Sequence, residues 1–169
     1  MQLQNSKKIA YLSLMVALSL IFSYVEMLLP INFGIPGVKL GLANVVSVVS
    51  LYIFGFGYTL IVVIARVILS GLLFGNMFAI IYSIAGGVIS LIVMELLKGT
   101  DKFSKIGVSI AGGVFHNIGQ LMIAAIVVKQ IKLYFYGPIL IASGIIMGAI
   151  IGIICIYLIK RVETYVRLC

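Results

Sequence analysis

The sequence predicts an all-α integral membrane protein with six transmembrane helices in one compact bundle. Of its 169 residues, 63% are hydrophobic and only 9% are charged, whereas soluble globular domains average about 45–50% apolar and about 25% charged residues. A membrane-spanning helix needs roughly 20 apolar residues, so six spans would occupy roughly 120 positions. Because only caps and short loops would remain, we expect residues 1–169 to form a single membrane domain.

Helix-breaking residues separate the apolar segments and define the predicted spans. A first apolar run of about 21 residues follows Lys7 and Lys8 without a small-residue cleavage motif, so we interpret it as a span and not as a signal peptide. Glycine or proline, typical of turns, interrupts the later runs at Pro30, Pro36, Gly55, Gly57, Gly75, Gly99, Gly137 and Pro138. We predict spans at residues 9–29, 38–54, 58–74, 77–97, 106–128 and 135–159. The second and third of these spans are short for a bilayer.

The basic residues predict the orientation. The net charge is +8, and most Lys and Arg residues lie at the ends of apolar runs. With both termini in the cytoplasm, the cytoplasmic segments contain Lys7, Lys8, Lys98, Lys102, Lys105, Lys160, Arg161 and Arg167, and the outer segments contain Lys39, Lys129 and Lys132. This distribution follows the positive-inside rule. We therefore expect a multi-pass protein of the cell membrane whose basic residues contact lipid headgroups and not nucleic acid.

Arg66 is the clearest candidate for a functional residue. It lies near the middle of the third predicted span, where insertion scales assign a central Arg a cost of about 2.5–3.5 kcal/mol. Arg keeps its proton at physiological pH, so it needs an acceptor. One interpretation is a structural ion pair with Glu26, near the outer end of the first span, and the other is an anionic ligand, or both together.

Other polar residues also map to the middle or outer half of the predicted membrane domain. In the fifth span, Ser109, Gly113, His116 and Gln120 follow a spacing that places them on one helical face. Each could be a packing residue when taken alone, but their common depth predicts an outward-opening polar pocket. The candidate ligand-binding residues are Glu26, Lys39, Asn44, Arg66, Asn76, His116, Asn117 and Gln120.

Small residues in two spans predict close helix contacts. Gly144, Gly148 and Gly152 follow one another at four-residue spacing in the last span, and Ser13 and Ala17 do so in the first. Such faces allow helix backbones to approach closely in membranes. They could serve packing within the bundle or the docking of another protein.

The residues needed for several kinds of catalysis are missing from the sequence. Prenyl diphosphate synthesis needs clustered carboxylates that hold Mg²⁺ on a diphosphate, and the four acids of this chain are scattered. No nucleotide-binding P-loop is present. Cys155 and Cys169 lack the spacing of metal ligands. We therefore expect no catalysis by this chain alone, no metal site and no resident cofactor, and any energy input must come from a partner or an ion gradient.

Several motifs across almost the whole chain resemble the Gx transporter family, often labelled heptaprenyl diphosphate synthase component I. They are Glu26 with Pro30, the run from Pro36 to Asn44 (PGVKLGLAN), the run from Ala65 to Gly71 (ARVILSG), Gly75-Asn76, the run from Ser83 to Gly87 (SIAGG) and the run from Gly107 to Gln120, which ends in HNIGQ. Members of that family resemble the substrate-binding S components of energy-coupling factor transporters, which are six-helix membrane proteins with an outward pocket.

The resemblance implies a transport function and a partner. S components use small residues of the first helix to dock a membrane-coupling subunit that works with ATPases, and Ser13 and Ala17 would take that position here. We therefore predict a substrate-binding or transport subunit for a small anionic or zwitterionic ligand. One alternative is a redox module that binds a quinone or flavin and works with a membrane redox partner, because some family members are associated with extracellular electron transfer. Another is a non-catalytic membrane component of heptaprenyl diphosphate synthesis.

Overall fold

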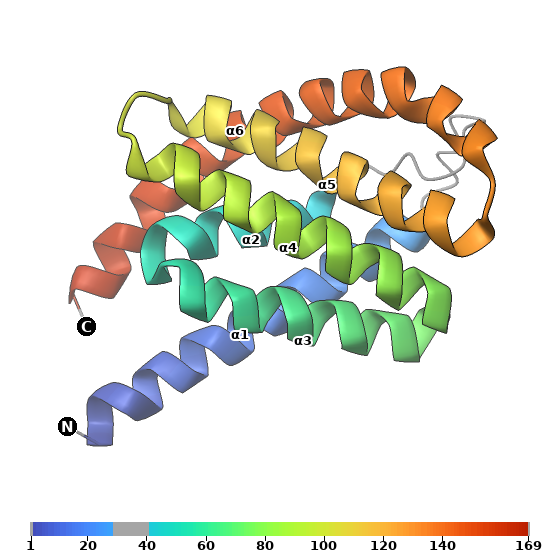
Figure 1. Cartoon of the computed structure of the whole chain (residues 1–169). Helices are drawn as coiled ribbons and strands as arrows, with labels where there is room; N and C mark the ends of the chain where they lie inside the picture. The colour runs from blue at the N-terminus through green and yellow to red at the C-terminus, as the bar shows by residue number, and fades with distance from the viewer. Residues whose placement is uncertain (1, 29–40, 169) are drawn as a thin grey trace.

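The computed structural model describes residues 2–28 and 41–168, and these residues are almost entirely helical (Figure 1). The helices are α1 (Gln2–Leu28), α2 (Leu42–Phe54), α3 (Phe56–Phe74), α4 (Met77–Gly99), α5 (Lys105–Val128) and α6 (Gly137–Leu168), with a short 3₁₀ helix η1 (Ile131–Tyr136) before α6. The prediction of an all-α fold is confirmed for the described residues.

Five of these helices are long and apolar enough to cross a membrane, and α2 is a shorter apolar helix. Large apolar side chains cover much of the outer surface, including the largely exposed Leu72, Leu73, Phe135 and Tyr157. Extended apolar surface of this kind is rare on soluble monomers. The protein is therefore a multi-pass membrane protein whose outer surface contacts lipid.

The helices form a closed ring. In spatial order α1 contacts α3, which contacts α4, followed by α5, α6 and α2, and α2 contacts α1 again. The helix α2 also contacts α3. Both described ends of the chain lie at the same end of the bundle, here called the terminal end, and the α3–α4 and α5–α6 connections lie at the opposite end (Figure 1).

The helix α2 is too short to cross the bilayer. Its 13 residues extend about 20 Å at 1.5 Å per residue, against a hydrocarbon thickness of about 30 Å. It begins after Gly41, whose φ of 72° lies in the left-handed region that glycine adopts without a steric penalty. Because α2 ends at the terminal end of the bundle, it begins partway along the neighbouring helices (Figure 1).

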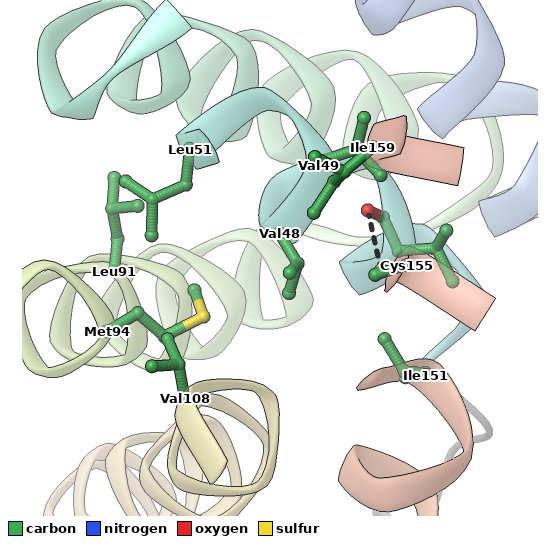
Figure 2. Close-up of a cluster of buried hydrophobic side chains, with 10 residues drawn as sticks. Val48, Val49, Leu51, Leu91, Met94, Val108, Ile151, Cys155 and Ile159 are labelled. Carbon is green, nitrogen blue, oxygen red and sulfur yellow. Dashed lines mark hydrogen bonds between the residues drawn. The ribbon is translucent and has the colours of Figure 1, made fainter. Parts of the chain in front are cut away.

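A hydrophobic cluster fills the terminal half of the bundle (Figure 2). It joins α2, α4, α5 and α6, and Leu51, Leu91 and Ile159 are fully buried. The Sγ atom of Cys155 contacts the carbonyl oxygen of Val45 at 3.6 Å. The cluster consists of Val45, Val48, Val49, Leu51, Leu91, Met94, Val108, Ile151, Cys155 and Ile159.

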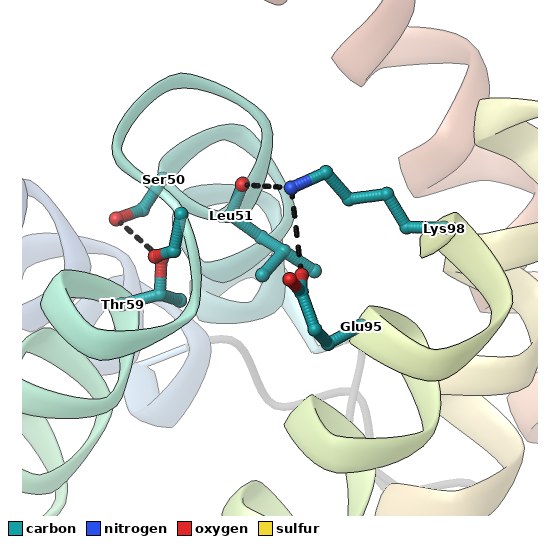
Figure 3. Close-up of polar contacts among 6 residues, drawn as sticks. Ser50, Leu51, Thr59, Glu95 and Lys98 are labelled. Atoms are coloured by element: carbon teal, nitrogen blue, oxygen red, sulfur yellow. Dashed lines mark hydrogen bonds and ion pairs between the residues drawn. The ribbon is translucent and has the colours of Figure 1, made fainter. Parts of the chain in front are cut away.

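Hydrogen bonds hold the terminal end of α2 against the neighbouring helices α3 and α4 (Figure 3). The ammonium group of Lys98 donates to the carbonyl oxygen of Leu51 at 3.0 Å and lies 3.4 Å from the carboxylate of Glu95. This bond satisfies a carbonyl near the end of α2 that has no partner within the helix. The hydroxyl groups of Thr59 in α3 and Ser50 in α2 are hydrogen-bonded to each other at 3.0 Å.

Glycines bring α5 and α6 into backbone contact. A Cβ atom added to Gly148 would lie 2.6 Å from the Cα atom of Ile110, and one added to Gly152 would lie 2.8 Å from the Cα atom of Ile106. Gly144 makes a similar approach to the backbone of Val114. The three glycines predicted to form a smooth face therefore pack against α5 within the bundle.

The helices lie close to the predicted spans, with differences at their ends. The helices α1 and α6 extend beyond the spans predicted at 9–29 and 135–159, toward the terminal end. The third span, predicted to be short, is a helix of 19 residues because Phe56 and Gly57 belong to α3. The first residues predicted for the second span, 38–40, lie outside the described residues.

Candidate functional site

A polar cavity of about 290 Å³ lies inside the ring, in the half opposite the terminal end. Each of the six α-helices contributes to its wall: the last turns of α1, the second half of α3, the starts of α2 and α4, the middle of α5 and the first half of α6. Its polar side chains are those of Ser23, Glu26, Asn44, Arg66, Ser70, Ser83, His116, Asn117, Gln120 and Ser143.

Arg66 is the most buried charged group of the cavity. It lies near the middle of α3 and only 9% of its surface is exposed. Its Nε atom is buried without a hydrogen-bond partner, and its side chain makes no hydrogen bond or ion pair with a described residue. A buried donor without a partner costs about 1–3 kcal/mol, and more when it is charged. The cavity therefore contains a guanidinium group that has no acceptor among the residues that the structure describes.

Glu26 lies in the same cavity but does not satisfy Arg66. One carboxylate oxygen accepts a hydrogen bond from the backbone N–H of Gly41 at 2.5 Å. No direct ion pair joins this carboxylate to Arg66 in the described structure. An acidic group is favourable at the N-terminus of a helix, so Glu26 connects the end of α1 to the start of α2.

Close packing between α4 and α5 positions His116 and Gln120. A Cβ atom added to Gly86 would lie 2.7 Å from the backbone oxygen of His116 and 2.7 Å from the Cγ atom of Gln120. Gly119 packs against the Cα atom of Gly86 in the same way. Without side chains at these two positions, α5 approaches α4 closely enough for His116 and Gln120 to line the cavity.

Asn117 is held by the neighbouring helix. Its side-chain amide donates to the backbone oxygen of Leu140 in α6 at 2.8 Å. This bond fixes the donor side of the amide and leaves the amide oxygen for another partner. Asn117 therefore links α5 to α6 and lines the cavity at the same time.

Of the eight predicted ligand-binding residues, the structure brings six together around this cavity: Glu26, Asn44, Arg66, His116, Asn117 and Gln120. Lys39 lies outside the described residues. Asn76 lies in a separate open depression between α4 and α5, with Phe78, Tyr82 and Val128. On α1, Ser13 and Ala17 are exposed.

Four serines of the cavity were not predicted: Ser23, Ser70, Ser83 and Ser143. Serine in an apolar helix often bonds to its own backbone, as Ser70 does to the carbonyl oxygen of Val67. Residue type therefore does not distinguish a cavity serine from a packing serine. A usable signal was the spacing of Ser70, one helical turn after Arg66 on the same face.

Asn76 has a structural contact at the start of α4. Its side-chain oxygen accepts a hydrogen bond from the backbone N–H of Ala79 at 2.8 Å, as an N-cap residue does. We expect Asn76→Ala to lower the free energy of unfolding by about 1 kcal/mol and to leave ligand affinity unchanged. Thermal unfolding and binding in detergent test this, with Asn76→Ser as the control that keeps a cap. A large loss of affinity in Asn76→Ala would contradict the assignment.

The fold and the cavity together define a class: helical multi-pass membrane proteins with a polar cavity enclosed by the helix ring. The described residues contain no group of three or more His, Cys, Asp or Glu residues that could hold a metal ion. The chain belongs to the heptaprenyl diphosphate synthase component I family, whose model matches residues 15–158. No curated protein and no solved structure matches the chain.

Proposed function

We propose that the protein is the substrate-binding subunit of a membrane transport system and holds a small anionic or zwitterionic ligand in the central cavity. The observation that carries this proposal is Arg66, a buried guanidinium near the middle of α3 that makes no hydrogen bond or ion pair with a described residue. Charged residues within a membrane usually mark a substrate or ion pathway. The amides of Asn44, Asn117 and Gln120 would give the directional hydrogen bonds on which the specificity of such sites depends.

The position of the cavity supports access from one side of the membrane. The hydrophobic cluster of α2, α4, α5 and α6 fills the other half of the bundle. Among the basic side chains that the structure describes, Lys98, Lys102, Lys105, Lys160 and Arg161 lie toward the terminal end. By the positive-inside rule that end faces the cytoplasm, so the cavity opens toward the outer face.

A binding subunit of this kind needs a partner for transport. A ligand could not cross the terminal half without displacing the hydrophobic cluster, and the sequence contains no P-loop to drive such a movement. The exposed Ser13 and Ala17 on α1 offer a surface on which the backbone of a partner helix could pack closely. We propose a membrane-coupling subunit with associated ATPases as that partner, by analogy with S components.

The family name favours a second candidate function. It describes a component of heptaprenyl diphosphate synthase, so the protein could be a non-catalytic membrane subunit beside a soluble synthase. A third possibility is a redox module, in which His116 and Gln120 would bond a quinone or flavin carbonyl. Co-purification with a soluble subunit rich in Asp would favour the second candidate, and a retained chromophore would favour the third.

The test is mass spectrometry of small molecules retained by the protein after purification in detergent. The proposal expects a specific polar compound in the unmodified protein that is absent from the Arg66→Met variant. The matched control is Arg161→Met, which removes an exposed basic residue of α6 far along the helix from the cavity. Equal retention of that compound by the Arg66→Met variant would contradict the proposal.

A further inference from the structure

The cavity wall carries one acidic and one basic side chain, and these two side chains do not form a direct ion pair. Apart from His116, Glu26 and Arg66 are the only ionisable side chains among the described residues of its wall. They come from α1 and α3, which are neighbours in the ring. No direct ion pair joins them in the described structure. Each charge therefore keeps bonding capacity for a third group.

The two residues can bond groups of opposite charge. The guanidinium of Arg66 has donors only and makes no hydrogen bond with a described residue. Glu26 uses one oxygen for the N–H of Gly41, but a carboxylate offers about four acceptor positions in total. An anionic group is needed at Arg66, and a donor group, best a cationic one, is needed at Glu26.

We infer that the ligand is a small zwitterion, whose anionic group bonds Arg66 and whose ammonium or similar cationic group bonds Glu26. This inference rests on the proposed function and specifies its substrate class. A ligand with only an anionic group would displace the water that bonds Glu26 and offer no donor in its place. A purely cationic ligand would displace the water that bonds Arg66 and offer no acceptor. Unpaired buried charges reject the wrong ligand as effectively as good contacts select the right one.

The size of the cavity also favours a small zwitterion. At about 290 Å³, it lies at the small end of the range of about 300–1,000 Å³ that drug-sized ligands occupy. The neutral polar side chains of the same wall, such as Ser23, Ser70 and Asn44, suit a compact and strongly hydrogen-bonding molecule. An amino-acid-like metabolite has the required charges and size.

The experiment uses a library of matched triplets of small polar compounds, incubated with the purified full chain in detergent. Each triplet contains a zwitterion, its N-acetylated analogue, which is only anionic, and its carboxamide, which is only cationic. Compounds that stay bound are quantified by mass spectrometry. We expect retention of at least one zwitterion, with its two analogues bound about tenfold more weakly or worse, because each lacks one charge-assisted contact.

Two variants test the assignment of the charges within a folded protein. In Glu26→Gln the preference for the zwitterion over its N-acetylated analogue should fall about tenfold, whereas Glu95→Gln at the terminal end should leave that ratio unchanged. Because the ratio compares two ligands on the same protein, a loss of folded protein cannot imitate it.

Two outcomes would overturn the inference, and they differ in what they say of the function. Retention of the anionic analogues as strongly as the zwitterions, with loss of both in Arg66→Met, would refute the zwitterion and leave the binding function intact. Retention of no compound of the library by the unmodified protein would refute the zwitterion and also count against the proposed function.

Discussion

Replacing Arg66 by Met is expected to abolish ligand binding and to leave the fold at least as stable as before. Two charge-assisted hydrogen bonds from a guanidinium to an anion contribute about 1.5–3 kcal/mol each, so affinity should fall by more than about 100-fold. The same change removes a charge that has no acceptor among the described residues. The free energy of unfolding should then rise, by up to about 3.5 kcal/mol on insertion scales.

The combination of these two effects is what distinguishes a ligand site from a structural residue. Thermal unfolding in detergent and equilibrium binding of the retained compound measure them on the same preparations. Arg66→Lys is the conservative control: it keeps the charge but loses the planar fork that matches a carboxylate, so part of the affinity should remain. A fall in the unfolding temperature of Arg66→Met by several degrees would show instead that Arg66 stabilises the bundle.

The helices could be predicted from the sequence because the bilayer fixes their length. The run from Met77 to Leu97 and the observed α4 (Met77–Gly99) begin at the same residue, since Gly75 and Asn76 interrupt the apolar pattern. The helix bounds predicted at the terminal end of the bundle were less accurate. Outside the hydrocarbon a helix can continue through polar residues such as Lys160 and Arg161, and hydropathy does not register that continuation.

The clustering of polar residues in one cavity could be predicted, but the residues with which they form hydrogen bonds could not. Six of the eight candidates line one cavity because a polar side chain at membrane depth must face the inside of the bundle. The ring order, in which α3 lies beside both α1 and α4, is a tertiary property that no local pattern contains. The bond between Glu26 and the N–H of Gly41 likewise depends on the contact of α1 with α2 in that ring. Asn76 has the residue type of a ligand group and also that of a helix N-cap, and the cap is the contact that the structure shows.

The second large effect concerns the contact between α5 and α6. We expect Gly148→Ala to lower the free energy of unfolding by about 1–3 kcal/mol, which is typical of overpacking in a well-packed core. The new Cβ atom would lie 2.6 Å from the Cα atom of Ile110 and 2.9 Å from the backbone oxygen of Ser109. Both are backbone atoms of α5, so the strain can be relieved only by moving one helix away from the other.

The matched control is Gly57→Ala in α3, where an added Cβ atom meets nothing within 4 Å. There the substitution should stabilise the protein slightly, because alanine is favoured over glycine in helices by up to about 1 kcal/mol. Thermal unfolding of both variants in the same detergent measures the difference. Equal stability of the two would mean that α5 and α6 separate at no cost and that the glycines are not needed for their contact.

The same substitution should also reduce ligand affinity, although Gly148 has no polar side chain. Gly113, Gly144 and Gly148 form part of the cavity wall, and Asn117 is bonded across the same helix pair to the carbonyl oxygen of Leu140. Moving α6 away from α5 would stretch that bond and widen the cavity on the side of Asn117. Loss of affinity in Gly148→Ala, with binding unchanged in Gly57→Ala, would show that the glycines set the shape of the site as well as the stability of the fold.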